Sequence, residues 1–211
     1  MKITKSILKK IIREEILKEM MDNNRLAHIR QIISGAEKGR KRQIKPYKQV
    51  ITRMELEYII QHGALDKFNF HGENFRGSDL SGLDLSGLDL DRADFSGANL
   101  EGTNLSGADL LHADFSGANL RNVNFRFTWL DHAKLVGADL SGANLHLTEL
   151  DGANLKNANL QNANLQGADL RHVSLEGADL TGAKYDNLWL FPKDLNPKKQ
   201  GMVFVEPERN P

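Results

Sequence analysis

The sequence predicts an all-β solenoid, in which the chain coils around its own side chains. From Phe70 to Leu190 every fifth residue is Phe, Leu or Tyr, at 25 consecutive positions. An α-helix advances about 100° per residue and a strand alternates its faces, so neither gathers a period of five on one face. A chain that bends once per five residues buries all of these positions, and its coils stack as a repeat protein.

The other positions of the five-residue unit have their own chemistry, counted from the apolar centre. The residue two before the centre is Ala in 14 of 25 units, as expected where a second inward side chain has little room. The residue just before the centre is Asp or Asn in 19 of 25, and these side chains hydrogen-bond the backbone at bends. The residue two after the centre is Gly in 14 of 25, which suits a corner.

A longer period gives the size of one coil. The segment ADFSGANL occurs at residues 93–100 and again at 113–120, and the centres Phe75, Phe95 and Phe115 are also 20 residues apart. Four units are therefore expected to make one coil. About six coils, with about 4.8 Å between stacked strands, form a rod roughly 29 Å long.

Units such as ADFSG, ANLEG, ADLSG and ANLKN resemble those of pentapeptide-repeat proteins, over residues 68–190. The resemblance implies a right-handed, four-sided (quadrilateral) β-helix with an apolar interior and with ends protected by helices or loops. It implies no single activity. The family includes many bacterial proteins of unknown role, and quinolone-resistance proteins that resemble DNA and bind topoisomerase.

The flanking sequences complete the domain organisation. Thr52 and Glu55 form a capping-box pattern that predicts a helix ending near His62, with Gly63 past its end. This helix is expected to cover the first coil, whose open edge would otherwise expose backbone groups. The predicted segments are a basic helical extension with a linker at 1–50, a capping helix at 51–63, the β-helix at 64–190 and a C-terminal cap or tail at 191–211.

Both ends of the chain contain further predicted elements. Residues 202–205 form a short strand pattern between Pro197 and Pro207, which suits a C-terminal cover. Residues 1–21 predict a helix and residues 22–33 a second one, and the opening phrase resembles short leaders of some phage-encoded proteins. The first helix is either a docking tag or a helix that packs on the solenoid, and packing is the favoured interpretation.

The formal charge of zero conceals an asymmetry. Residues 1–65 have a net charge of +8 and residues 66–190 a net charge of −9. The basic run within the linker could bind nucleic acid or an anionic membrane. A solvated linker is favoured, because no aromatic platform or nucleic-acid fold accompanies the run. Its basic residues are Lys38, Arg40, Lys41, Arg42 and Lys45.

Several classes of function are disfavoured. The chain has no cysteine, which excludes disulfides, thiolate metal sites and cysteine nucleophiles. No stretch approaches the roughly 18 uncharged apolar residues of a membrane helix, and the expected location is the cytoplasm. No nucleophile, base and orienting group occur together, so we expect neither an enzyme nor a cofactor site.

The register separates inward from outward aromatic residues. Phe127 lies where the rule is Gly, and Trp129 lies where the rule is Asp or Asn, so both are expected outside. Leu147 is expected to stack on Phe127 one coil later, and Leu111 lies on an adjoining outward position one coil earlier. These four residues predict a partner-binding patch. The residues expected in the core are Phe75, Phe95, Phe115, Phe125 and Leu130.

Two alternatives stay open for this patch. It is either an interface with a partner or a second copy, or a surface that an N-terminal helix of the same chain covers. Trp189, in the column of Trp129, could be covered by the C-terminal tail in the same way.

Three histidines share the corner column two after the centres. His112 and His132 are expected on adjacent coils, where stacked imidazoles could share a metal ion. The column also holds Arg92 and Gly152, and His172 stands further on without a third ligand. Ordinary surface histidines are therefore the favoured interpretation.

The sequence thus favours a non-catalytic binding or scaffold protein whose rigid β-helix presents the patch to a protein partner or to another copy. The alternative, motivated by the family resemblance and by the acidic repeat region, is a DNA-mimicking regulator that binds a topoisomerase.

Overall fold

The computed structural model describes residues 52–61, 63, 65, 68, 70–187 and 191–206. The chain divides into two compact units, Met1–Ile44 with Met54–Phe68, and Lys45–Arg53 with Asn69–Pro211. The predicted N-terminal helices, the basic run and Trp189 lie outside the described residues.

One helix, α3, spans Arg53–Gln61. It begins directly after Thr52, and Gly63 beyond its end has a φ of +58°. The N–H of Gly63 donates to the carbonyl oxygen of Ile60 at 2.9 Å, which closes the last turn. A helix is thus found where the sequence predicts one, and its role as a cover for the first coil stays a prediction.

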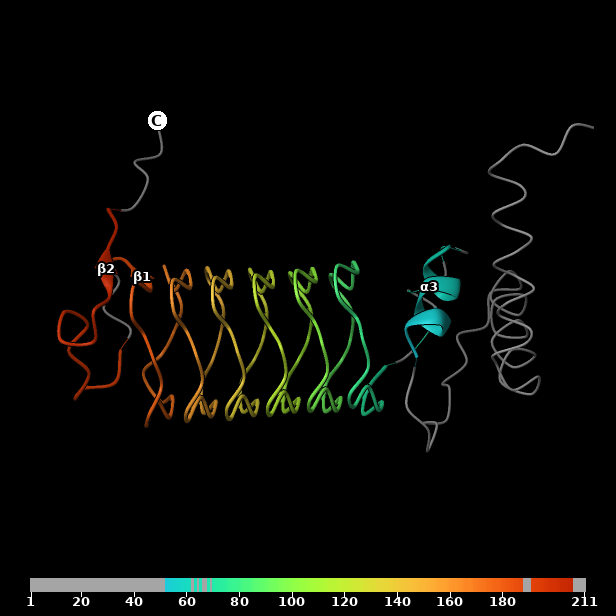
Figure 1. Cartoon of the computed structure of the whole chain (residues 1–211), viewed down its shortest axis with the longest axis horizontal. Coiled ribbons are helices and arrows are strands. Elements are labelled where there is room, and N and C mark those ends of the chain that lie inside the picture. Colours follow the sequence, from blue (N-terminus) through green and yellow to red (C-terminus); the bar gives the residue numbers. More distant parts are fainter. Residues whose placement is uncertain are drawn as a thin grey trace, which may run out of the picture. The chain divides into compact units, whose positions relative to one another are not determined.

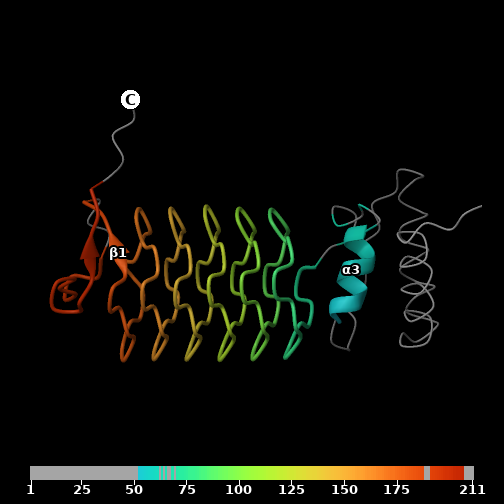
Figure 2. The ribbon, with the colours of Figure 1, turned by 45° about the horizontal axis from the view of Figure 1, so that its top comes forward.

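The repeat region forms a stack of coils (Figures 1 and 2). Parallel β-bridges join residues 20 apart, for example Asn74 with Asp94 and Asp94 with Asp114. These bridges form four columns, and within the described residues three columns contain six residues and the fourth contains five. The spacing confirms that four units make one coil. The right-handedness of the β-helix stays a prediction from the family.

Most corners of the coils are type II β-turns, as Leu80–Leu83 illustrates. The N–H of Leu83 donates to the carbonyl oxygen of Leu80 at 3.2 Å, and Gly82 has a φ of +67°. A positive φ at the third residue of the turn defines this type and favours Gly there. The Asp79 carboxylate accepts the N–H of Ser81 at 3.1 Å, which explains why Asp or Asn precedes the centre.

The apolar centres fill the interior of the coils. Phe75, Phe95 and Phe115 stack on adjacent coils with ring centroids 4.8 Å apart. Phe125 meets the edge of Phe115 at 5.8 Å. Leu130 and the four rings are at most 1% exposed. These five side chains therefore lie in the core, where the sequence analysis placed them.

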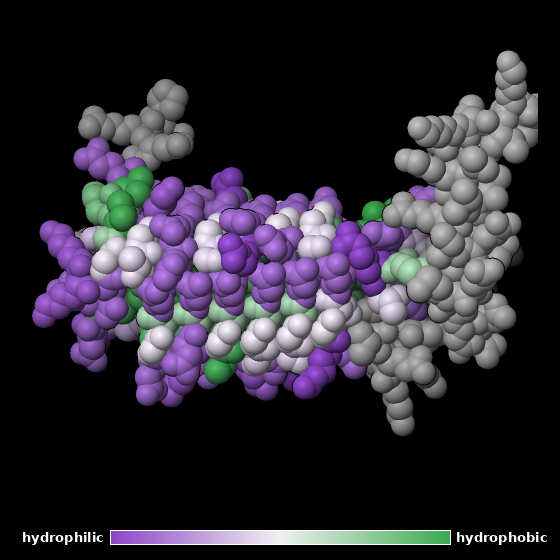
Figure 3. Space-filling model, viewed as in Figure 1, coloured by the Kyte–Doolittle hydropathy of each residue, from purple (hydrophilic) through white to green (hydrophobic). Residues whose placement is uncertain are grey.

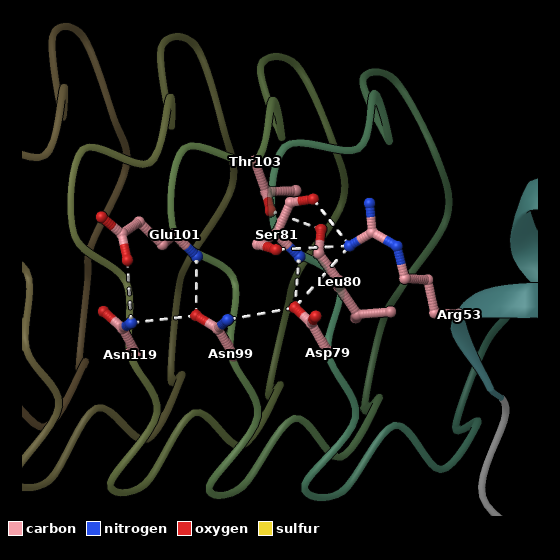
Figure 4. A network of polar contacts seen from close by, with 8 residues as sticks. All are labelled: Arg53, Asp79, Leu80, Ser81, Asn99, Glu101, Thr103 and Asn119. Atoms are coloured by element: carbon pink, nitrogen blue, oxygen red, sulfur yellow. Dashed lines mark hydrogen bonds and ion pairs between the residues drawn. The ribbon is translucent and has the colours of Figure 1, made fainter.

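Side-chain hydrogen bonds run along the outside of the stack (Figure 4). Asn99 donates to the Asp79 carboxylate at 3.0 Å, and Asn119 donates to the Asn99 side-chain oxygen at 2.9 Å. The guanidinium of Arg53 lies 3.7 Å from the Asp79 carboxylate and donates to the carbonyl oxygen of Ser81. Figure 3 shows hydrophilic and neutral residues in straight rows along the axis.

The C-terminal segment adds one more strand to the stack. Strand β1, Lys184–Tyr185, pairs in parallel with β2, Val203–Phe204. The N–H of Val203 donates to the carbonyl oxygen of Ala183 at 2.8 Å. A strand therefore lies where the sequence predicts one, and it pairs with part of the last coil.

Candidate functional site

Three large apolar side chains of the coils are exposed to solvent. Phe127 is 53% exposed, Trp129 47% and Leu147 41%, and we call these three residues the apolar patch. Trp129 lies on the side whose outward column is Asp89, Asp109, Trp129, Glu149 and Asp169, here called the fourth side. Phe127 and Leu147 lie on adjacent coils at the corner that precedes this side.

Leu111, which was expected in the same patch, is half-buried. It is less exposed than Phe127, Trp129 and Leu147. It lies at the opposite corner of the fourth side, one coil before Asp131. Its side chain is therefore at the margin of the apolar patch.

Two patch residues adopt a backbone conformation that favours glycine. The φ of Phe127 is +57° and that of Leu147 is +55°. A side chain with a Cβ in this left-handed region costs about 1 kcal/mol. Exposure of a large apolar side chain and an unfavourable backbone conformation thus coincide at both positions. Neither feature contributes to the packed interior.

Buried threonines follow both of these residues. The Oγ1 of Thr128 donates to the carbonyl oxygen of Leu105 at 2.9 Å, and the Oγ1 of Thr148 donates to that of Phe125 at 2.7 Å. These bonds hold the corners of Phe127 and Leu147 to the preceding coil. This role was not predicted, although Thr replaces the usual Ala directly after each bulky corner residue.

Different contacts surround the two aromatic rings of the patch. The Arg126 guanidinium lies 5.0 Å from the centroid of the Phe127 ring, and the His146 ring meets that ring edge-on at 6.3 Å. The Trp129 ring has no aromatic or cationic partner within the described residues, and its indole N–H donates no hydrogen bond there. Among the described residues, neither the face of the Trp129 ring nor its indole N–H therefore has a partner.

Carboxylates flank Trp129 along the axis. Asp109 and Glu149 pair with it through the β-bridges of the preceding and following coils. Asp131 lies two residues further along the same coil. Near the end of the fourth side, the Arg171 side chain hydrogen-bonds Asp169 and holds the pKa of that carboxyl below its usual range.

The histidine column contains one stacked pair. The rings of His112 and His132 lie 5.2 Å apart and are nearly parallel. The Nδ1 of His172 lies against the Asp151 carboxylate instead. In the part of the chain that the structure describes, no three or more potential ligands form a group that could hold a metal ion.

The repeat units match a family model described as pentapeptide repeats, in 8 copies over residues 64–97, 89–126, 98–135, 130–160 and 148–184. These matches span more than half of the chain. The chain belongs to the pentapeptide-repeat family.

Several solved structures of this family resemble the chain. A trypsin-treated variant of QnrB1, a plasmid-mediated fluoroquinolone resistance protein, is 20% identical, with 77% of this chain and 88% of that chain covered and a TM-score of 0.44. Rfr23 from the cyanobacterium Cyanothece 51142 is 30% identical, with 63% and 91% covered and a TM-score of 0.32. HetL from Nostoc, involved in the regulation of heterocyst differentiation, is 30% identical, with 56% and 76% covered and a TM-score of 0.23.

A comparison with curated proteins found no significant match. Among the described residues, no helix has the length and apolar character needed to cross a bilayer.

Proposed function

We propose that this pentapeptide-repeat protein is a non-catalytic binding or scaffold protein that contacts a protein partner through the apolar patch. One observation carries the proposal: the three large apolar side chains exposed on the described coils lie together, and two of them occupy left-handed corners. Exposed apolar clusters on a monomer are typical of interaction sites.

The scaffold beneath the patch is suited to this role. The stacked core and the bonds from Thr128 and Thr148 fix the backbone of the patch before any partner arrives. A preorganised surface loses less conformational entropy on binding than a mobile one. Aromatic side chains such as Trp129 also contribute most of the binding energy at many interfaces.

The test compares the full-length protein with the double variant Phe127→Ser and Trp129→Ser. A matched control, Val203→Ser with Phe204→Ser, removes a pair on β2 that is exposed to a similar extent, 49% and 50%. We expect the parent and the control to capture the same protein, or to form the same oligomer by light scattering, and the patch variant to lose it. Equal capture and equal mass for all three would contradict the proposal.

A second candidate is the DNA-mimicking regulator of a topoisomerase. The fourth side favours it, because four of its five outward residues are carboxylates at successive coils, and only Trp129 interrupts the row. A supercoiling assay with the purified protein tests this candidate. Inhibition that disappears when Asp109 and Glu149 are neutralised would support it, and no effect at micromolar protein would exclude it.

A further inference from the structure

We infer that the partner of the apolar patch presents a basic amphipathic segment. One cationic side chain of that segment would lie over Trp129, and its apolar side chains would contact Phe127 and Leu147. This inference rests on the proposed function and specifies the chemistry of the partner.

Carboxylates surround Trp129 on three sides. Asp109, Asp131 and Glu149 flank it, and none of these carboxylates forms an ion pair within the described residues. Of the other four carboxylates on the same side and corner, Asp89, two coils before Trp129, is also without an ion pair in the described part of the chain, and the remaining three are paired with basic side chains. The pairs are Asp91 with His71 and Arg92, Asp151 with His172, and Asp169 with Arg171. Three of the four unpaired carboxylates of this side and corner therefore lie beside Trp129.

The Trp129 ring itself is suited to a cationic side chain. A Trp face attracts a Lys or Arg side chain more strongly than Phe or Tyr does. The Phe127 ring already has such a cation, since Arg126 lies 5.0 Å from its centroid. Trp129 has none in the described part of the chain, and it is 47% exposed. The open cation site of the patch is thus the Trp129 ring between two carboxylates.

The rest of the apolar patch lies beside this acidic surface. Phe127 and Leu147 occupy adjacent coils, about 4.8 Å apart along the axis. They offer an apolar strip next to the acidic column. A partner with positive charge alone would leave this strip exposed, and a polyanion such as nucleic acid would be repelled by the carboxylates. A segment with basic and apolar residues on neighbouring faces satisfies both parts.

Titration calorimetry of the full-length protein tests the inference with three synthetic peptides. The first is an amphipathic helix of Leu and Lys, the second replaces Leu by Ser, and the third replaces Lys by Glu. We expect saturable binding of the Leu/Lys peptide that weakens as salt is added, because exposed charges are screened. Trp129→Ser should weaken it about tenfold. Glu149→Gln should weaken it about threefold.

A matched control is Glu101→Gln, which removes the same charge at an exposed corner on another part of the coils. It should leave the affinity unchanged. No binding, or binding that Trp129→Ser and Glu149→Gln do not alter, would overturn the inference, as would equal affinity for the Ser/Lys peptide. The Leu/Glu peptide could bind as tightly as the Leu/Lys peptide and lose its binding in Trp129→Ser. That result would show that the partner need not be basic, and it would leave the proposed function standing. The proposed function itself fails only in the capture experiment.

Discussion

At the residue scale, a side chain in the left-handed conformation at a corner restricts which residue can occupy the same corner one coil later. Asn122 occupies this conformation, with a φ of +54°, and a Cβ built on Gly142 one coil later would lie 2.5 Å from its Oδ1. The side chain of the first residue thus occupies the space over the second. The same relation holds for three further pairs: Asn157 with Gly177, Asn162 with Gly182, and His132 with Gly152.

This relation predicts a difference between two glycine substitutions. Gly137 and Gly142 have similar φ values, +65° and +69°, but a Cβ on Gly137 meets nothing within 4 Å. Gly137→Ala should cost about 1 kcal/mol for its backbone conformation alone. Gly142→Ala should cost more, because it also displaces the Asn122 side chain. Urea denaturation measures both, and the excess should vanish when Asn122→Gly is combined with Gly142→Ala.

A second pair of substitutions separates packing from surface chemistry. Phe127→Asn should change the free energy of unfolding by less than about 1 kcal/mol, because Asn tolerates a positive φ. It should also abolish partner binding. Phe125→Ala, only two residues away but fully buried, should lower stability by about 3–5 kcal/mol. A large destabilisation by Phe127→Asn in thermal or urea unfolding would show that this ring is structural.

At the scale of the structural element, the ladders of amide side chains have a direction. Along the column that begins at Asp84 and continues through Asn104 to Asn164, each Asn donates to the residue one coil earlier. The series thus begins on a carboxylate. The donor–acceptor pairs are Asn104 to Asp84, Asn124 to Asn104, Asn144 to Asn124 and Asn164 to Asn144. Each side-chain oxygen also accepts a backbone N–H of its own corner, as Asn124 does from Arg126 at 3.3 Å.

The ladder predicts opposite outcomes for two Asn-to-Asp substitutions. Asn124→Asp removes the donor to Asn104, which is 2.9 Å away, and places a carboxylate against that acceptor oxygen. We expect a loss of about 1–2 kcal/mol. Asn154→Asp places its carboxylate one coil after Lys134 and should be neutral or slightly stabilising. Equal effects of the two in urea unfolding would exclude a role for the ladder.

Much of the element structure could be predicted from the sequence because inward positions admit few residue types. The centre must be apolar and the corner must accept a positive φ, so the periods of five and 20 appear directly in the letters. The direction of the amide ladder could not be predicted, because Asn can donate either way along the axis. In the structure, the side-chain oxygen of each Asn accepts the backbone N–H of its own corner. The side-chain NH2 group is then the one that donates along the axis.

At the scale of the whole molecule, the carboxylates make stability depend on pH. The Ser86 hydroxyl and N–H hydrogen-bond the Asp84 carboxylate and lower the pKa of that group. Ser81 lowers the pKa of Asp79 in the same way. A carboxyl whose pKa is lower in the folded than in the unfolded chain stabilises the fold above the unfolded pKa, near pH 4.

This contribution should be lost as the pH falls through the folded pKa. We therefore expect the free energy of unfolding to decrease below about pH 4. The variant Asp84→Asn should be less stable than the parent at neutral pH, and the difference should shrink in acid. Unfolding curves at a series of pH values measure it, and a difference that does not change with pH would contradict the assignment.

The candidate site could be predicted only in part. Phe127 and Trp129 break the positional rules, so their outward direction follows from the register. The reduced exposure of Leu111 could not be predicted, because it depends on how neighbouring side chains lie at the corner. The threonine anchors were visible in the sequence, but Thr at an inward position looks like a slightly larger Ala until its hydroxyl finds a carbonyl oxygen.

The four-unit coil also separates two coordinates of every surface residue, its height along the axis and its angle around it. Removal of one five-residue unit before Phe127 would turn everything that follows by a quarter of a circle relative to the earlier coils. Removal of four units would keep every angle and shorten the stack by one strand spacing, about 4.8 Å. Gain or loss of whole coils can thus move a binding site along the axis while its facing direction stays the same.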